Sequence, residues 1–159
     1  MLRHTRQRKN EQGFSLIELL IVVAIIGILI AIIVPAYQGT VRKANDTNAI
    51  GTLEAIKKEQ IGYAQDKRGN YGTFDELLKA GYLNDKFSGE APVVQGYIFT
   101  MKVVAKGSGN QTAFYSVNAD PQQIGGVGAT GTHHYYIDSN LSNIRVNDEQ
   151  PASASDPAL

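Results

Sequence analysis

The chain has 159 residues, no cysteine and a formal net charge of zero, from 15 basic and 15 acidic side chains. This length suits one small domain with an accessory segment. The lack of cysteine excludes disulfides, thiolate metal sites and a cysteine nucleophile, and the neutral balance gives no global electrostatic basis for binding nucleic acid.

The charges are distributed unevenly along the chain. Residues 1–13 hold four basic side chains and one acidic side chain, whereas the rest holds 11 basic and 14 acidic ones, a net charge of −3. A short basic arm in front of an apolar segment is typical of a targeting and orientation signal. The arm contains Arg3, Arg6, Arg8 and Lys9, with Glu11 as its acid.

An almost entirely apolar segment follows over residues 14–36, and its stretch 19–34 has no polar side chain. As a helix, these 23 residues extend about 35 Å, which is enough to span a bilayer. Because the basic arm precedes the segment, we expect the N-terminus to lie in the cytoplasm.

Residues 37–66 predict an amphipathic helix that continues the apolar segment, because apolar and small side chains recur mostly every three or four residues. Together the two segments predict one helix of roughly fifty residues, about 75 Å long. Gly27 and Pro35 are candidates for a helix break, since proline removes a backbone donor and clashes with the preceding turn. The predicted stripe consists of Tyr37, Val41, Ala44, Ile50, Leu53, Ile56, Gln60 and Ala64.

The residues after this helix predict a short helix and a sheet. Thr73 and Glu76 have capping-box spacing, and Gly81 is suited to end the short helix that they begin. Apolar residues then alternate with polar ones, the pattern of strands with one buried face. We expect an antiparallel sheet packed on the amphipathic half of the long helix, an α+β fold. The predicted strands lie within residues 97–105, 115–119, 135–137 and 144–146.

The chain thus divides into a leader (1–13), an apolar helix (14–36), a globular domain (37–149) and a tail (150–159). The tail is rich in Pro, Ala and Ser and has no periodicity. This composition predicts disorder.

The junction between leader and apolar segment reads Gly13-Phe14-Ser15-Leu16-Ile17-Glu18. Glu18 is the one ionisable side chain between Phe14 and Pro35. A charged carboxylate at the bilayer centre costs about 2.5–3.5 kcal/mol or more, so an acid here indicates a buried cationic partner. The junction resembles the type IV prepilin motif, in which a basic leader and a Gly precede Phe-x-Leu-x-Glu and an apolar helix.

The resemblance implies a processing route and the pilin fold. A dedicated prepilin peptidase and methyltransferase cuts between Gly13 and Phe14 on the cytoplasmic face and N-methylates Phe14. Glu18 is implied to pair with the Phe14 amine of a neighbouring subunit. Gly27 and Pro35 match positions that bracket a stretch which often unwinds in assembled filaments.

The function implied by the resemblance is that of a structural subunit of a type IV pilus, not an enzyme. The precursor would sit in the bacterial inner membrane, engage an inner-membrane assembly platform and polymerise with its own copies into an extracellular or periplasmic filament. No cofactor, metal or nucleic acid is expected. A pseudopilin of a type II secretion system is the first rival. A DNA-uptake minor pilin is the second, against which the near-neutral body argues.

Two simpler interpretations of the N-terminus remain. A conventional signal peptide could be cut after the small residue Ala36, which would leave Tyr37 as the first residue. A plain single-span anchor would not be cut. Neither interpretation predicts Gly13-Phe14 or the carboxylate of Glu18 at this spacing.

Several late residues are candidates for binding. The pattern G-x-G-x-x-G at residues 126–131 is followed by a strand pattern where a phosphate site needs a helix, so we expect a loop. His133 and His134 point to opposite faces of a strand and are not suited to chelate one ion together. Loop acids offer oxygen ligands that calcium prefers, or are simply solvated. These acids are Asp120, Asp138 and Asp148.

The last part of the body resembles the sheet end of certain pilins and major pseudopilins. The resemblance runs through Pro121, residues 128–138 and Ile144-Arg145. The glycine common after Asp-x-x in that pattern is absent. Many pilins staple this region with a disulfide, and a chain without cysteine must hold it by packing and hydrogen bonds.

Overall fold

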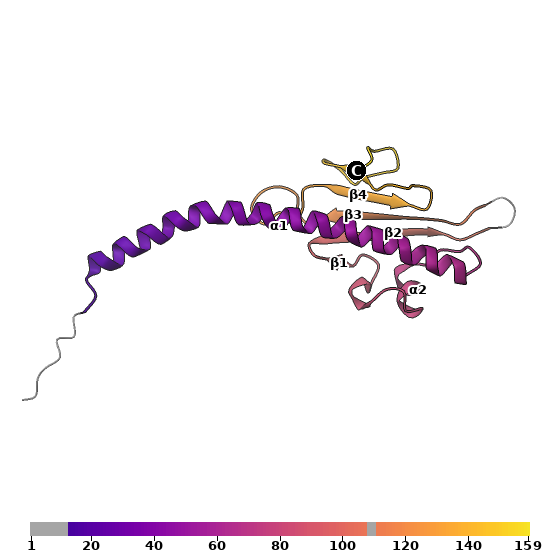
Figure 1. Cartoon of the computed structure of the whole chain (residues 1–159), viewed down its shortest axis with the longest axis horizontal. Coiled ribbons are helices and arrows are strands. Elements are labelled where there is room, and N and C mark those ends of the chain that lie inside the picture. The colour runs from indigo at the N-terminus through magenta and orange to yellow at the C-terminus, as the bar shows by residue number, and fades with distance from the viewer. Residues whose placement is uncertain (1–12, 108–110) are drawn as a thin grey trace, which may run out of the picture. The chain divides into compact units, whose positions relative to one another are not determined.

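A computed structural model describes residues 13–107 and 111–159. The chain divides into two units, residues 1–37 and residues 38–159. One helix, α1 (Leu16–Asp66), has 51 residues and contributes to both units, which confirms the predicted single long helix (Figure 1). Residues 1–12 of the predicted leader lie outside the described residues.

The second unit contains a five-stranded antiparallel sheet in the order β1-β2-β3-β4-β5. The four predicted strands are confirmed, and β1 was not predicted because a two-residue strand shows no alternation. Gln95 and Gly96 both have positive φ, 49° and 80°, as a tight two-residue hairpin between β1 and β2 requires. The strands are β1 (Val93–Val94), β2 (Tyr97–Val104), β3 (Phe114–Pro121), β4 (His134–Asp138) and β5 (Arg145–Asn147).

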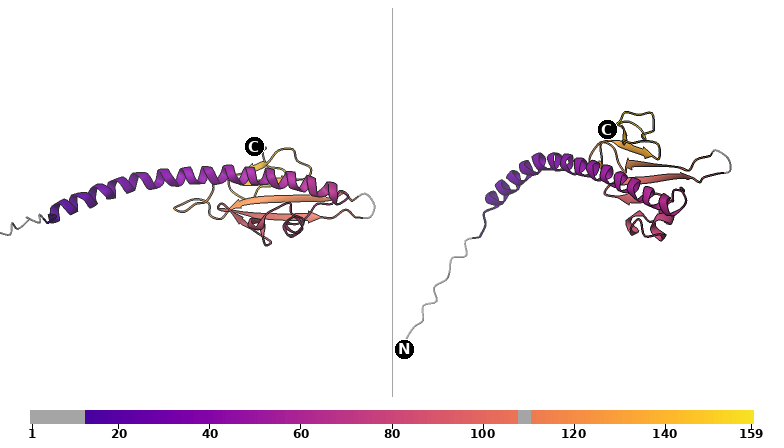
Figure 2. Two further views of the ribbon diagram at one scale, coloured as in Figure 1. Left: turned by 60° about the horizontal axis from the view of Figure 1, so that its bottom comes forward. Right: turned by 45° about the vertical axis from the view of Figure 1, so that its right-hand side comes forward.

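One face of this sheet packs on the C-terminal half of α1, as Figure 2 shows. Register places Phe99 opposite Ala119 and Val117 opposite Ile137, so these side chains form rows on the buried face. The prediction of a sheet covering an amphipathic helix is confirmed. The core side chains of the sheet are Tyr97, Phe99, Tyr115, Val117, Ala119, Tyr135 and Ile137.

The buried face of α1 differs in part from the predicted stripe. Tyr37 is 69% exposed, and Ala44 is exposed as well. The predicted stripe contains mostly apolar residues and omits Asp46, the polar residue at which burial begins. The buried positions keep helical spacing: Asp46, Ala49, Leu53, Ile56, Gln60 and Tyr63.

The short helix α2 (Phe74–Lys79) begins at the predicted capping box. The Thr73 hydroxyl accepts from the Glu76 amide, and the Glu76 carboxylate accepts from the Thr73 amide. Gly81 follows the helix with φ at +80°, a backbone conformation that glycine adopts without steric cost. A single 3₁₀ turn, η1 (Asp85–Phe87), then leads to β1 and buries Phe87.

The predicted disorder of residues 150–159 is contradicted by the structure. Ala152 is buried, and its carbonyl accepts from the Asn118 amide side chain at 2.7 Å. The Val146 and Leu159 amides donate to the carbonyls of Pro157 and Ile144. These partners lie far away in sequence or are backbone groups, so composition gives no sign of them. The segment covers the outer edge of β5.

Candidate assembly site at the N-terminal end

Gly13 and Phe14 stand immediately before α1, in the first unit of the chain. Phe14 is 81% exposed, so nothing in the described part of the chain shields the Gly13–Phe14 bond. A Cβ at Gly13 would meet no atom within 4 Å. Contacts within the described residues therefore do not require glycine here.

Glu18 caps the first turn of α1. The Ser15 amide donates to its Oε2 atom at 2.9 Å, and Ser15 has the N-cap position because the helix begins at Leu16. This contact is the carboxylate half of a capping box, and a negative charge is favourable at a helix N-terminus. The sequence signal for this cap is Ser-x-x-Glu at residues 15–18. Glu18 thus lies four residues after Phe14, the predicted new N-terminus.

Large apolar side chains are exposed throughout the first half of α1. Every large apolar residue from Phe14 to Val34 is 45% exposed or more, and Leu16 reaches 82%. By length and composition, α1 is able to cross a membrane. An apolar surface of this size is unfavourable in water. It indicates that lipid or other protein chains surround the first half of α1.

Gly27 and Pro35 do not break α1, which is continuous from residue 16 to residue 66. The predicted break is therefore absent from the single chain. Proline removes one backbone donor, and the hydrogen bonds of neighbouring turns suffice to keep a long helix continuous. A Cβ at Gly27 would meet no atom within 4 Å. As at Gly13, contacts among the described residues therefore do not explain why this position is glycine.

Comparisons with known proteins agree with this geometry. Residues 8–34 match the family described as the prokaryotic N-terminal methylation motif. A 47-residue segment, 30% of this chain, is 55% identical to fimbrial protein Q of Moraxella bovis and covers 30% of that protein. Over its N-terminal part, the chain is therefore similar to type IV pilins.

Two further relatives show how far the likeness extends. The type IV wide pilus major component PilA4 of Thermus thermophilus is 38% identical over 73 residues, 46% of this chain and 56% of that protein. The type II secretion system core protein G of Aeromonas hydrophila is 31% identical over 74 residues, 46% of this chain and 51% of that protein. The chain therefore spans about a third to a half of the length of these relatives. No solved structure matches it.

A buried polar cluster fixes α1 to the sheet in the second unit of the chain. Asp46 is 8% exposed, and its Oδ1 atom accepts from the Tyr97 hydroxyl at 2.5 Å and from the Thr132 amide at 3.0 Å. Its Oδ2 atom accepts from the Thr132 hydroxyl. The Asn45 side chain donates to the Thr130 carbonyl at 2.8 Å. Sequence analysis missed this cluster because its partners lie 51 to 86 residues apart.

The pKa of Tyr97 is raised well above its usual range, chiefly because the ring is buried and also because its hydroxyl donates to Asp46. The neutral phenol is therefore the form that the folded domain holds, as a hydrogen-bond donor needs. A Cβ at Gly131 would lie 2.6 Å from the Tyr97 ring carbon Cζ. Glycine at position 131 is thus required for the loop to close over this hydroxyl.

The two histidines have separate carboxylate partners. His134 Nδ1 lies 2.5 Å from Asp120 Oδ1. His133 lies between Asp46 and Asp148, with nitrogen–oxygen distances of 3.5 and 3.4 Å. Each histidine thus faces carboxylates of its own.

The candidate calcium ligands are engaged in contacts within the domain. Asp120 and Asp148 face the histidines, and Asp138 accepts from the Tyr136 hydroxyl and from the amides of Asn140 and Leu141. No group of three or more His, Asp or Glu suited to a metal ion occurs among residues 13–107 and 111–159. The glycine-rich residues 126–131 precede a strand, β4, where a phosphate site needs a helix.

Proposed function

We propose that this chain is a structural subunit of a type IV pilus. The observation that carries the proposal is an exposed apolar half-helix that begins directly after Gly13-Phe14 and carries one carboxylate, Glu18. The precursor inserts in the bacterial inner membrane with its basic leader in the cytoplasm. A prepilin peptidase removes residues 1–13, and Phe14 becomes the methylated N-terminus.

Assembly then moves the apolar half of α1 from lipid into the core of a helical filament. Both environments are apolar, whereas exposing this surface to water would cost tens of kcal/mol at about 25 cal/mol per Å². Subunits that meet through different surfaces, without closing a ring, form an open filament. Gly27 and Pro35 are the positions where we expect α1 to unwind when it is packed among its neighbours.

Glu18 sets the axial register in this proposal. Cleavage creates a new amine at Phe14, and the Glu18 carboxylate neutralises the amine of the adjacent subunit. In an apolar core each charge is costly alone, and one axial offset brings the two together. In the single chain the Glu18 carboxylate accepts from the amide of Ser15, the residue after Phe14, which supports this pairing. This contact would be exchanged for the stronger, charged partner on assembly.

An intact-mass measurement on membrane-extracted protein tests the processing. We expect a chain that begins at methylated Phe14, and a chain that begins at Tyr37 would refute the proposal. Gly13→Leu should leave the precursor uncut. Glu18→Val should be inserted and cut normally but yield few filaments by electron microscopy of sheared cells, with a loss of about 3–5 kcal/mol per contact. Normal filaments of Glu18→Val would show that Glu18 is not needed to pair with the Phe14 amine.

A pseudopilin of a type II secretion system is the alternative, favoured by the 31% identity over 74 residues to core protein G of Aeromonas hydrophila. Both candidates use the same helix and differ in where the filament stands. Surface filaments in sheared fractions support the pilus. Their absence, together with a secretion defect in a deletion strain, supports the pseudopilin. We assign no catalytic role and no nucleic-acid partner to the subunit.

A further inference from the structure

The described residues contain no ion pair made by a lysine or an arginine. The three ion pairs of residues 13–107 and 111–159 all involve His133 or His134. A domain with many side chains of both signs would bring some into contact by chance alone. Here the lysines and arginines make no such pair, so their charged groups are available to a second molecule.

Three cations gather at the end of the domain where α1 ends. Lys67, Arg68 and Lys106 line one groove of about 590 Å³, together with Tyr63 and Tyr71. We call this the basic groove. Two structural features shape this groove. The Lys106 amide donates to Asn70 Oδ1 at 2.9 Å, which holds the end of β2 beside the end of α1. Arg68 has φ at 57°, which turns the chain sharply after the helix.

Two acids also line the basic groove, and both are engaged by neutral donors. Asp66 accepts from the Tyr82 hydroxyl, and Glu76 accepts from the Thr73 amide at 2.8 Å. Lys67 lies over the Tyr63 ring at 5.7 Å. Within the described part of the chain, Arg68 and the Lys106 side chain have neither a hydrogen bond nor an ion pair. Three cations against two acids leave the groove with a net charge of +1, and Arg68 and Lys106 make none of the described ion pairs.

The complementary charge lies at the opposite end of the domain. Residues 147–150 follow β5, and we call them the acidic loop after Asp148 and Glu149. Asn147 Oδ1 accepts from the amides of Glu149 and Gln150, at 3.0 and 3.1 Å, which fixes the loop. The Asp148 side chain is 74% exposed. Its one described ionic contact is His133, and His133 also contacts Asp46.

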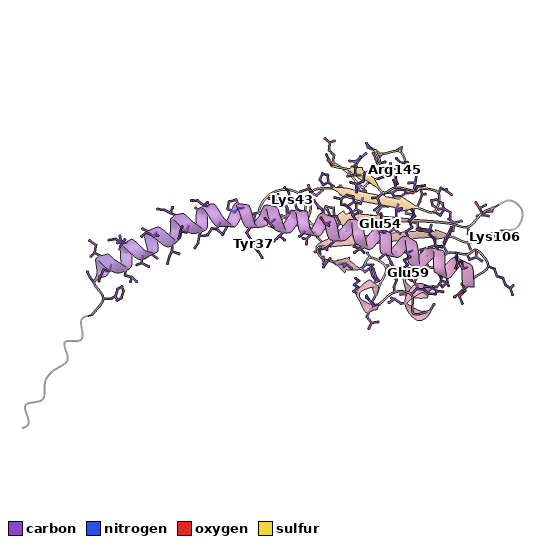
Figure 3. All side chains as sticks on the ribbon, in the orientation of Figure 1. Tyr37, Lys43, Glu54, Glu59, Lys106 and Arg145 are labelled. Atoms are coloured by element: carbon purple, nitrogen blue, oxygen red, sulfur yellow. The ribbon has the colours of Figure 1, made fainter. Side chains whose placement is uncertain are left out.

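The basic groove and the acidic loop do not meet within one chain. The acidic loop is linked through His133 to Asp46, whereas the groove lies beyond Asp66 at the other end of the buried half of α1. Twenty residues of helix separate Asp46 from Asp66, about 30 Å. Figure 3 shows the labelled Lys43 and Lys106 at these two ends. Each charged surface therefore needs a partner from outside the chain.

We propose that the basic groove of one subunit receives the acidic loop of the next copy of this chain. The proposal rests on the filament function given above, since it names the contact between globular domains along that filament. Surfaces of opposite sign at opposite ends form a head-to-tail contact that repeats without closing. Charge complementarity of this kind steers encounter and fixes register, and the two tyrosines give the groove apolar walls for the carbon stems of the loop.

Charge reversal tests the contact in cells that express only the variant. Arg68→Glu with Lys106→Glu, or Asp148→Lys with Glu149→Lys, should lower filament yield at least about tenfold. All four changes together should restore it. Lys79→Glu with Lys86→Glu is the matched control, because both lysines are exposed and neither lines the groove. Mature mass and subunit level in the membrane should equal those of the wild type.

Cross-linking gives a second readout that does not depend on yield. The chain has no cysteine, so Lys106→Cys with Glu149→Cys introduces one defined pair. On oxidation of sheared filaments we expect a ladder of covalent multimers, whereas each single cysteine gives no species beyond a dimer. Filaments of the double variant without a ladder would overturn the contact.

The outcomes separate this contact from the filament function itself. Absence of filaments in the wild type would be a failure of the proposed function. Wild-type filaments with undiminished yield in both charge-reversed variants would overturn the head-to-tail contact and leave the function standing. If reversal in the groove instead lowered binding of sheared filaments to DNA or heparin at normal yield, the groove would be a surface for polyanions and the contact would be wrong.

Discussion

Replacement of Asp46 by alanine should strongly destabilise the globular domain. Asp46 accepts three hydrogen bonds, from the Tyr97 hydroxyl and from the amide and hydroxyl of Thr132. A hydrogen bond to a charged group contributes about 1.5–3 kcal/mol, and a buried donor left without a partner costs about 1–3 kcal/mol. These contributions overlap and do not add.

The expected loss of stability depends on which of these donors find another acceptor when the Asp46 carboxylate is removed. The Tyr97 hydroxyl also lies 2.9 Å from the His133 carbonyl, so it keeps one acceptor. The Thr132 hydroxyl is partly exposed and can turn to water, whereas its amide loses its one described acceptor. We therefore expect Asp46→Ala to lower the free energy of unfolding by about 3 kcal/mol. Asp46→Asn keeps an acceptor oxygen and should lose about half as much.

Urea unfolding of the fragment 38–159 measures both changes. A loss of about 3 kcal/mol corresponds to a melting temperature lower by roughly 10 °C or more for a domain of this size. Glu54→Ala is the matched control, because Glu54 is an exposed acid on the same helix and should change stability by less than about 0.5 kcal/mol. If Asp46→Ala behaves like this control, the cluster does not hold α1 to the sheet.

Three further predictions concern the same domain. The fragment 38–159 should be a soluble, folded monomer because it forms one unit, and a need for detergent on gel filtration would contradict this. Burial raises the pKa of Tyr97 and Tyr135 above the usual value near 10, and that of Tyr136 to about 12. These groups stabilise the fold fully below about pH 10, and stability should fall above it by about 1.4 kcal/mol per pH unit for each buried tyrosine. Urea titrations at high pH should show this dependence of stability on pH. Tyr97→Phe should reduce the slope by about 1.4 kcal/mol per pH unit, the contribution of one titrating tyrosine. Deletion of residues 150–159 should cost about 1–3 kcal/mol by removing the contacts with Asn118 and β5, and an unchanged unfolding midpoint would show that the tail contributes nothing.

Much of the fold could be predicted from the sequence because its signals are local. Alternation over eight residues is enough to define β2 and β3, since the period fixes the buried face. The capping box at Thr73 involves four adjacent residues. The apolar run before Pro35 is recognisable from composition and length alone.

The parts that could not be predicted depend on partners distant in sequence. Gln60 lies on the predicted stripe and is fully buried, although glutamine is usually exposed, but its hydrogen-bond partner was not predicted. Its amide donates to the Gly72 carbonyl at 2.6 Å and its carbonyl accepts from the Gly72 amide at 3.0 Å. Only the tertiary fold provides that matching pair. The tail was misjudged for the same reason, since its composition contains no sign of the Asn118 side chain that binds the Ala152 carbonyl.

The N-terminal residues differ from the globular unit, because contacts within the chain do not explain them. In the globular unit, a Cβ at Gly72 would lie 2.9 Å from the Tyr63 ring, and one at Gly131 would overlap Tyr97, so these glycines are explained by neighbours in the same chain. Gly13 and Gly27 have open space around them. Phe14 and the apolar side chains after it also have no packing partner in the described structure. These residues are the ones to which the proposed function assigns processing and assembly, so the features that contacts within one chain leave unexplained are those that the proposal explains.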